Sequence, residues 1–144
     1  MAETGNEHNE RQEQEQTLYE QLGGEETVDR LVKAFYERVY RTPELIPLFQ
    51  TDMQEVMEKQ RLFLTQFLGG PAHYSMQYGP PRLRMRHLPF EITPARAQAW
   101  LRCMREAMDE IGLEGPLRDW FYMRLTQVAE FMVNTAEGPT TSAE

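Results

Sequence analysis

The sequence contains a single cysteine, Cys103, among its 144 residues. One thiol forms neither an internal disulfide nor a cysteine-based zinc cluster, and it suits a reducing compartment. Because free cysteine is among the most frequently buried residue types, we expect Cys103 to be a small core residue rather than a redox centre. Long apolar runs are also absent, so no segment reaches the roughly 18 apolar residues that a membrane-spanning helix needs. The polar, acidic start of the chain resembles neither a secretory signal nor an Arg-rich transit peptide, and we expect a cytoplasmic location.

Positive charge is scarce as well. The chain has 15 Lys and Arg residues against 23 Asp and Glu residues, which gives a formal net charge of −8. Residues 1–16 and 135–144 are polar and bury too little apolar surface to offset the entropy of ordering, so we predict a disordered acidic N-terminal tail and a flexible C-terminal tail. A single domain is expected between them, at residues 17–134. The overall acidity argues against binding a phosphate backbone, so no nucleic-acid partner is expected.

Several common catalytic patterns are missing. The only serines, Ser75 and Ser142, fall in a predicted loop and a predicted tail, which provides no nucleophilic triad. The sequence has no glycine-rich phosphate loop before a helix and no HExxH or CxxC motif. These classes of site are therefore not expected.

Helical periodicity, by contrast, runs through most of the chain. Apolar residues recur at spacings of three and four in four long segments, at residues 25–41, 53–68, 94–111 and 116–133. Thr93 and Pro94 predict the N-cap and the first position of the third segment. In the last segment the residues expected to be buried are Leu117, Trp120, Phe121, Leu125, Val128 and either Phe131 or Met132. Because no alternating strand pattern competes, the predicted class is all-α.

Glycine and proline separate the periodic segments. A short helix at residues 17–22 is predicted to end at a glycine pair, and two prolines produce a turn that ends at Phe49. Residues 71–81 contain three prolines and show no period, so they are predicted to form a loop long enough to carry a function. Residues 82–87 have room for little more than one helical turn before Pro89.

His87 is the histidine with the most distinctive surroundings. His8 lies in the predicted tail and His73 in the predicted loop, and both are expected to be solvated. His87 instead follows the one-turn helix and is flanked by apolar residues. Haem needs one neutral nitrogen ligand on a fixed backbone in an apolar pocket, and His87 meets that description. From composition alone, a lone histidine of this kind is more often an ordinary core or surface residue, so both interpretations stay open.

Tyr36, Gln60 and Trp100 are predicted on the inward faces of three different helices. Buried polar groups require partners. Tyrosine and tryptophan often satisfy this need by bonding to backbone within the core. The alternative is that all three side chains point into one cavity and donate to a bound ligand. Periodicity does not choose between these hypotheses.

Three arginines, Arg82, Arg84 and Arg86, alternate with apolar residues before His87. They fit a solvated surface turn. In a haem protein they would instead pair with the propionate carboxylates, and Lys59 would do the same from the second long helix.

Four motifs resemble, in order, those of the group II truncated haemoglobins. The run Pro81-Arg82-Leu83-Arg84-Met85-Arg86-His87-Leu88-Pro89-Phe90 is similar to the proximal-histidine segment of that family. The others are Gly23-Gly24 with the aromatic pair Phe35-Tyr36, Gly69-Gly70-Pro71 with Tyr74-Ser75, and the tryptophan segment Trp100-Leu101-Arg102-Cys103-Met104. The resemblance covers roughly Leu18 to Asn134.

The resemblance implies a two-over-two helical sandwich around one haem b. It makes His87 the proximal iron ligand, Tyr36 the main distal donor, Trp100 a second donor and Gln60 a third polar group near the ligand. Val56 stands where other globins often have a distal histidine. The predicted haem contacts are Phe35, Phe49, Lys59, Phe63, Leu83, Arg84, Arg86, Phe90 and Met104. The His87 Nδ1 is expected to donate to a carbonyl one turn earlier, near Leu83.

The implied function is reversible binding of oxygen and other diatomic gases at ferrous iron, by a monomer or a homodimer. A redox enzyme on the same haem, either a nitric oxide dioxygenase or peroxidase-like, is the alternative and would need an external reductase. A haem-free helical interaction module is a third possibility. The sequence does not separate the first two.

Overall fold

The computed structural model describes residues 16–137, and helices are the regular structure in that range. In chain order they are α2 (Leu18–Leu22), α3 (Gly24–Val39), the 3-10 helix η1 (Ile46–Leu48), α4 (Met53–Phe67), α5 (His73–Tyr78), α6 (Leu83–His87), α7 (Pro94–Glu110) and α8 (Pro116–Met132). No strand occurs within the described range, which confirms the all-α class. Of the predicted tails at residues 1–16 and 135–144, residues 1–15 and 138–144 lie outside this range. Residues 135–137 lie inside it, where Thr135 and Glu137 make hydrogen bonds to Ile92 and Ala95.

Short polar side chains begin three of the helices. The hydroxyl of Thr17 accepts from the Glu20 amide at the start of α2, and the carboxylate of Asp52 accepts from the Gln54 amide at the start of α4. Thr93 caps α7 with Pro94 at its first position, as predicted. The predicted ends of the four long helices therefore agree with the structure to within two residues.

The loop predicted at residues 71–81 is wrong in part, because it contains the six-residue helix α5. The side chain of Gln66 holds this helix on α4: its Oε1 accepts from the Ser75 amide at 2.9 Å, and its Nε2 lies 2.7 Å from the Ser75 hydroxyl. The ring of Tyr74 is buried edge-on against Phe63, with 5.9 Å between ring centroids. Tertiary contacts therefore support a helix that is too short to produce a visible period.

The buried face of α8 also differs from the prediction. Trp120 is 43% exposed and Leu117 is 37% exposed, whereas of the two alternatives Phe131 and Met132 it is Met132 that is buried. The residues of α8 that are buried are Phe121, Leu125, Ala129 and Met132. Because α8 carries large apolar side chains on both faces, its periodicity does not select the inner one. On the outer face, the Arg124 guanidinium covers the Trp120 ring at 5.2 Å.

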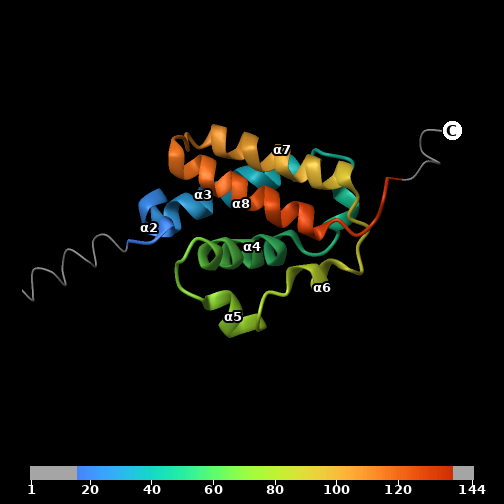
Figure 1. Cartoon of the computed structure of the whole chain (residues 1–144), viewed down its shortest axis with the longest axis horizontal. Coiled ribbons are helices and arrows are strands. Elements are labelled where there is room, and N and C mark those ends of the chain that lie inside the picture. The colour runs from blue at the N-terminus through green and yellow to red at the C-terminus, as the bar shows by residue number, and fades with distance from the viewer. Residues whose placement is uncertain (1–15, 138–144) are drawn as a thin grey trace, which may run out of the picture.

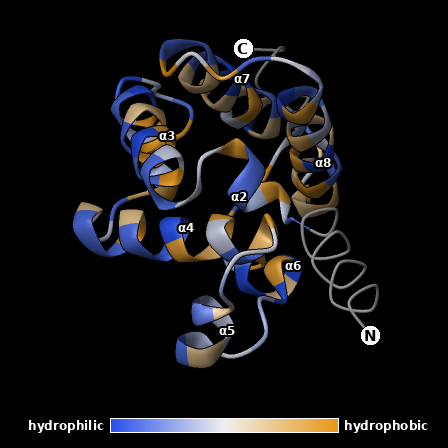
Figure 2. Ribbon diagram, turned by 90° about the vertical axis from the view of Figure 1, so that its left-hand side faces the viewer, coloured by the Kyte–Doolittle hydropathy of each residue, from blue (hydrophilic) through white to orange (hydrophobic). Residues whose placement is uncertain are grey.

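The long helices pack as neighbours around one interior. In Figure 1, α7 and α8 run side by side above α4, and α6 lies at one end of α4. The end view in Figure 2 shows α3, α7 and α8 above α4, with hydrophobic residues turned inward. An ion pair of 2.6 Å between Arg38 and Glu110 joins α3 to α7. Cys103 is buried in this core, as expected, with its sulfur 3.5 Å from the Thr42 hydroxyl.

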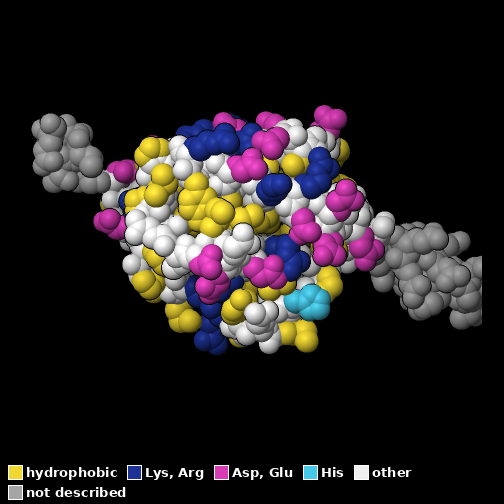
Figure 3. All heavy atoms as spheres, turned by 180° about the vertical axis from the view of Figure 1, so that it is seen from behind, with side chains coloured by type: hydrophobic (Ala, Val, Ile, Leu, Met, Phe, Trp, Pro, Cys, Tyr) yellow, Lys and Arg dark blue, Asp and Glu magenta, His cyan; other side chains and the backbone are white. Residues whose placement is uncertain are grey.

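The surface mixes charges of both signs. On the face seen in Figure 3, acidic and basic side chains are interspersed and apolar side chains gather between them. None of the described helices is long and apolar enough to cross a membrane.

Gly70 packs closely against both backbone and an aromatic ring. A Cβ built there would lie 2.9 Å from the Thr65 carbonyl oxygen and 2.9 Å from the ring of Tyr19. We expect Gly70→Ala to lower the free energy of unfolding by about 1–3 kcal/mol through overpacking, measured by urea denaturation. In a Tyr19→Ala background the loss should be smaller, because one of the two clashes is gone. Additive losses in the two variants would contradict this account.

Candidate functional site

A cavity of about 490 Å³ lies between α3, α4, α6, α7, α8 and the turn at η1. Pockets for small molecules and cofactors usually span roughly 300–1,000 Å³ and are mostly apolar. Most of the lining here is aliphatic or aromatic, and a few polar side chains are set among those groups. The cavity therefore has the size and character of a cofactor site.

Most of the residues predicted for the site line this cavity. They are Tyr36, Phe49, Val56, Lys59, Gln60, Phe63, Leu83, Arg86, His87, Phe90 and Trp100. They come from the four helices α3, α4, α6 and α7, from the turn after η1 and from the segment after α6, so the fold brings together side chains that are far apart in sequence.

Phe35, Met104 and Arg84, which were also predicted for the site, do not line the cavity. Phe35 and Met104 are fully buried in the core. The ring of Phe35 lies 4.9 Å from the Tyr36 ring and 5.2 Å from Trp100, so it supports these side chains from behind. The guanidinium of Arg84 donates to the Phe131 carbonyl, 2.8 Å away at the end of α8. The spacing of apolar residues along a helix does not distinguish a residue that lines the cavity from one buried in the core next to it.

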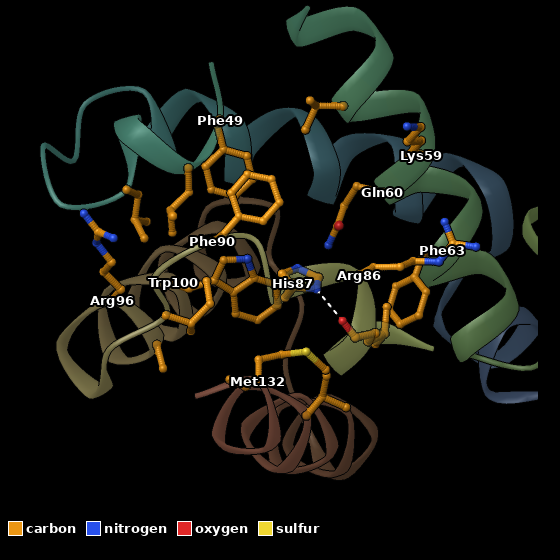
Figure 4. Close-up of a pocket in the computed structure, with 18 of the residues that line it drawn as sticks. Phe49, Lys59, Gln60, Phe63, Arg86, His87, Phe90, Arg96, Trp100 and Met132 are labelled. Carbon is orange, nitrogen blue, oxygen red and sulfur yellow. Dashed lines mark hydrogen bonds between the residues drawn. The ribbon is translucent and has the colours of Figure 1, made fainter. Parts of the chain in front are cut away.

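His87 is the last residue of α6 and is partly buried at the cavity wall. Its Nδ1 lies 2.7 Å from the Leu83 carbonyl oxygen, a bond that confirms the prediction and is drawn in Figure 4. A carbonyl oxygen only accepts, so Nδ1 must carry the proton. In the neutral imidazole the other nitrogen, Nε2, then carries the lone pair, and it makes no hydrogen bond with a described residue. That is the tautomer in which histidine binds a metal through Nε2.

Tyr36, Gln60 and Trp100 bring hydrogen-bond donors into the cavity. None of these three side chains makes a hydrogen bond to another residue within the range 16–137. In the same range, every fully enclosed side-chain nitrogen or oxygen has a hydrogen-bond partner. Their polar ends therefore border the open space. Figure 4 shows Gln60 and Trp100 directed into the cavity near His87. The three donors are therefore free to bond to a molecule that occupies the cavity.

The protonation of Tyr36 suits a donor. The residue is only 2% exposed, and burial raises the pKa of its hydroxyl far above the ordinary value. The neighbouring Tyr40 raises that pKa further. The Tyr36 hydroxyl therefore keeps its proton at any physiological pH.

Aromatic rings form the cavity wall beside Tyr36. Phe49 meets the ring of Tyr36 edge-on, with 5.7 Å between centroids. The hydroxyl of Tyr40 donates to the Phe49 carbonyl oxygen at 3.3 Å, which ties the turn after η1 to α3. On the other side, the Phe90 ring lies 6.4 Å from the His87 ring.

Three cations line the cavity, one of which the sequence analysis missed. Lys59 is paired with Glu55 at 3.4 Å, and Arg86 donates to carbonyls of the segment before α6. Arg96 also lines the cavity and donates to the Glu91 carbonyl at 2.6 Å. Its position one turn before Trp100 placed it on the same helical face, which is the signal that would have found it.

The residues present fit a haem. The flat ring of a haem needs apolar walls, and its carboxylates favour cations at the edge of the site. The cavity provides both, together with one histidine whose metal-binding nitrogen is free. The described residues contain no cluster of three His, Cys, Asp or Glu side chains that would hold a bare metal ion instead.

Comparison with known proteins agrees with this geometry. Residues 17–140 match the model of the bacterial-like globin family. The chain is 50% identical over 125 residues to the group 2 truncated haemoglobin YjbI of Bacillus subtilis (strain 168), which covers 87% of this chain and 94% of that protein.

Solved structures show the same fold. The group II truncated haemoglobin of Bacillus anthracis superimposes with a TM-score of 0.84 at 48% identity, covering 86% of this chain and 95% of that one. The oxygen-avid truncated haemoglobin of Bacillus subtilis superimposes with a TM-score of 0.80 at 51% identity, covering 83% of this chain and 100% of that one. The fold predicted from the motifs is thereby confirmed, and the chain belongs to the group II truncated haemoglobins.

Proposed function

We propose that the chain binds one haem b in the cavity and reversibly binds oxygen and other diatomic gases, with His87 as the iron ligand. The observation that carries the proposal is the meeting of a free His87 Nε2 with three unpaired donors in a single apolar cavity. Tyr36 acts as the main donor to the gas, Trp100 as the second, and Gln60 as a third polar group near it. The wider family membership supports haem binding as such.

On the proximal side, the chain orients the imidazole of His87, the proposed iron ligand. A ferrous haem supplies an open coordination position at which a diatomic gas binds. The Leu83 carbonyl fixes the His87 tautomer and stops the ring from turning about its Cβ–Cγ bond. The ring of Phe90 lies beside the imidazole, tilted with respect to it. Lys59, Arg86 and Arg96 lie where they would offset the charge of the haem carboxylates.

On the distal side, the chain provides donors among mostly apolar side chains. Each well-placed hydrogen bond in such a pocket contributes about 1–3 kcal/mol. Two bonds of this strength slow release of the gas by roughly two orders of magnitude or more, because about 1.4 kcal/mol corresponds to a factor of ten. Slow release suits scavenging, sensing or redox chemistry better than bulk delivery. The related Bacillus subtilis protein is described as oxygen-avid, which is consistent with this expectation.

The test is direct. The purified chain, titrated with haemin, should show a Soret band that saturates at one haem per chain. After reduction under nitrogen, admission of air and then carbon monoxide should give two further distinct spectra, and purging should restore the first. A colourless chain that refuses haemin would contradict haem binding, and a haem spectrum unchanged by either gas would contradict gas binding.

A further inference from the structure

The C-terminal end of α8 continues into a segment, residues 133–137, that is bonded across the His87 side of the cavity. The amide group of Asn134 donates to the carbonyl oxygens of His87 at 3.2 Å and Phe90 at 2.9 Å. Its Oδ1 accepts from the Ile92 amide at 3.0 Å. One side chain thus bonds to three successive points of the backbone that carries the proximal histidine.

Further hydrogen bonds, from both backbone and side chains of residues 134–137, strengthen the same connection. The amides of Asn134 and Thr135 both donate to the Ile92 carbonyl, at 3.0 and 3.2 Å. The hydroxyl of Thr135 donates to Asn134 Oδ1 at 2.7 Å and so holds that amide group in its orientation. Glu137 accepts from the Ala95 amide in the first turn of α7 at 2.5 Å.

Arg84 fixes the other end of the same region. Its Nη1 donates to the carbonyl oxygens of Phe131 and Val133, each at 2.8 Å, where the last carbonyls of α8 lack helical partners. The guanidinium also lies over the Phe131 ring at 5.7 Å. Arg84 therefore joins the first turn of α6 to the end of α8.

The helix α6 needs such support. It has five residues, and helices far shorter than about 12–15 residues are not stable by themselves. It begins after Arg82, whose φ of 40° is the one positive value among the non-glycine residues described. Neither Arg84 nor Asn134 lines the cavity, so both act on a haem only through the backbone of α6.

We propose that Asn134 and Arg84 are positioning residues that hold the His87 backbone in place and thereby set the geometry of the iron–histidine bond. This inference rests on the proposed function, because it needs a haem at His87. The residues at the end of α8 thus have a role although they do not line the cavity. The hydrogen bond from Asn134 to the His87 carbonyl oxygen fixes the position of the His87 backbone and, through it, of the imidazole.

The test uses the full chain loaded with haem. Asn134→Ala removes all the side-chain bonds. Asn134→Asp keeps an oxygen for the Ile92 amide but is unable to donate to the His87 and Phe90 carbonyls when ionised. In both variants we expect the iron–histidine stretching band of the reduced, gas-free protein to shift or broaden in resonance Raman spectra. Haem transfer to an excess of an apoglobin acceptor should accelerate about tenfold, the effect of about 1.4 kcal/mol.

Hydrogen exchange gives a readout that does not depend on the haem spectrum. The Ile92 amide should exchange faster in Asn134→Ala but stay protected in Asn134→Asp. The matched control is Gln127→Ala, which removes an exposed amide from α8 and should change none of these measurements. Thr135→Val, which removes only the hydroxyl that orients Asn134, should give a smaller change of the same sign and serves if the Asn134 variants fail to fold.

The outcomes separate the two proposals. A wild-type chain that takes up no haem overturns the proposed function and this inference together. Haem-loaded Asn134 variants, or Thr135→Val in their place, with the wild-type Raman band and the wild-type rate of haem transfer overturn the inference alone.

Discussion

The His87→Gly variant is expected to lose stable haem binding, with at least a hundredfold weaker uptake of haemin in a Soret titration, and to regain a Soret band when imidazole is added. The glycine removes the only imidazole among the cavity-lining residues. It also leaves a space of the shape of the lost ring, which free imidazole fills. Loss of a metal ligand with its fixing bond to Leu83 is costly because both the bond and its orientation disappear.

The control is His73→Gly. His73 is exposed at the start of α5 and lies outside the cavity, so this variant should take up haemin like the wild type. A normal five-coordinate ferrous spectrum in His87→Gly without imidazole would refute the assignment of the iron ligand. Failure of imidazole to restore the band, in a variant that melts like the wild type, would argue that the space beside Leu83 is not where the ligand acts.

The long helices were predictable because their signals are long. Three or four turns of apolar spacing, closed by Thr93 at one end or a glycine at the other, leave little freedom in where a helix lies. The helix α5 was not predictable in this way, because its six residues are held by Gln66, which belongs to another element. The buried face of α8 was equally unpredictable from the sequence. Trp120 and Phe121 are both large and apolar, and only packing decides which one is buried.

The site shows the same division between local and tertiary information. His87 was found from its own neighbours in sequence, and its bond to Leu83 is local because it joins residues four apart. The arginines were harder to place. Arg84 turns away from the cavity because the end of α8 arrives beside it, 47 residues later in the chain. Arg96 lines the cavity, and its place one turn before Trp100 on the same face of α7 becomes informative only once Trp100 is known to face that cavity.

Oxygen release should be faster by roughly one to two orders of magnitude in Tyr36→Phe, measured by stopped-flow replacement of oxygen with carbon monoxide. The substitution keeps the ring, which packs against Phe35 and Phe49, and removes only the hydroxyl. A donor of about 1–3 kcal/mol is lost, and about 1.4 kcal/mol is a factor of ten. Carbon monoxide release should change less, because that ligand accepts hydrogen bonds more weakly than oxygen does.

Tyr40→Phe is the matched control, because it removes a hydroxyl from the neighbouring ring. That hydroxyl donates to the Phe49 carbonyl and does not line the cavity, so oxygen release should stay within about twofold of the wild type, the effect of a few tenths of a kcal/mol.

Because burial keeps the Tyr36 hydroxyl protonated, its effect on the rate of oxygen release should also be constant across the neutral and mildly alkaline range. Trp100→Phe should accelerate release in the same direction but by a smaller factor. Equal rates of oxygen release in the wild type and Tyr36→Phe would remove Tyr36 from the distal role. If the rate in Tyr36→Phe divided by the rate in the wild type falls as the pH rises, the Tyr36 hydroxyl titrates in that range.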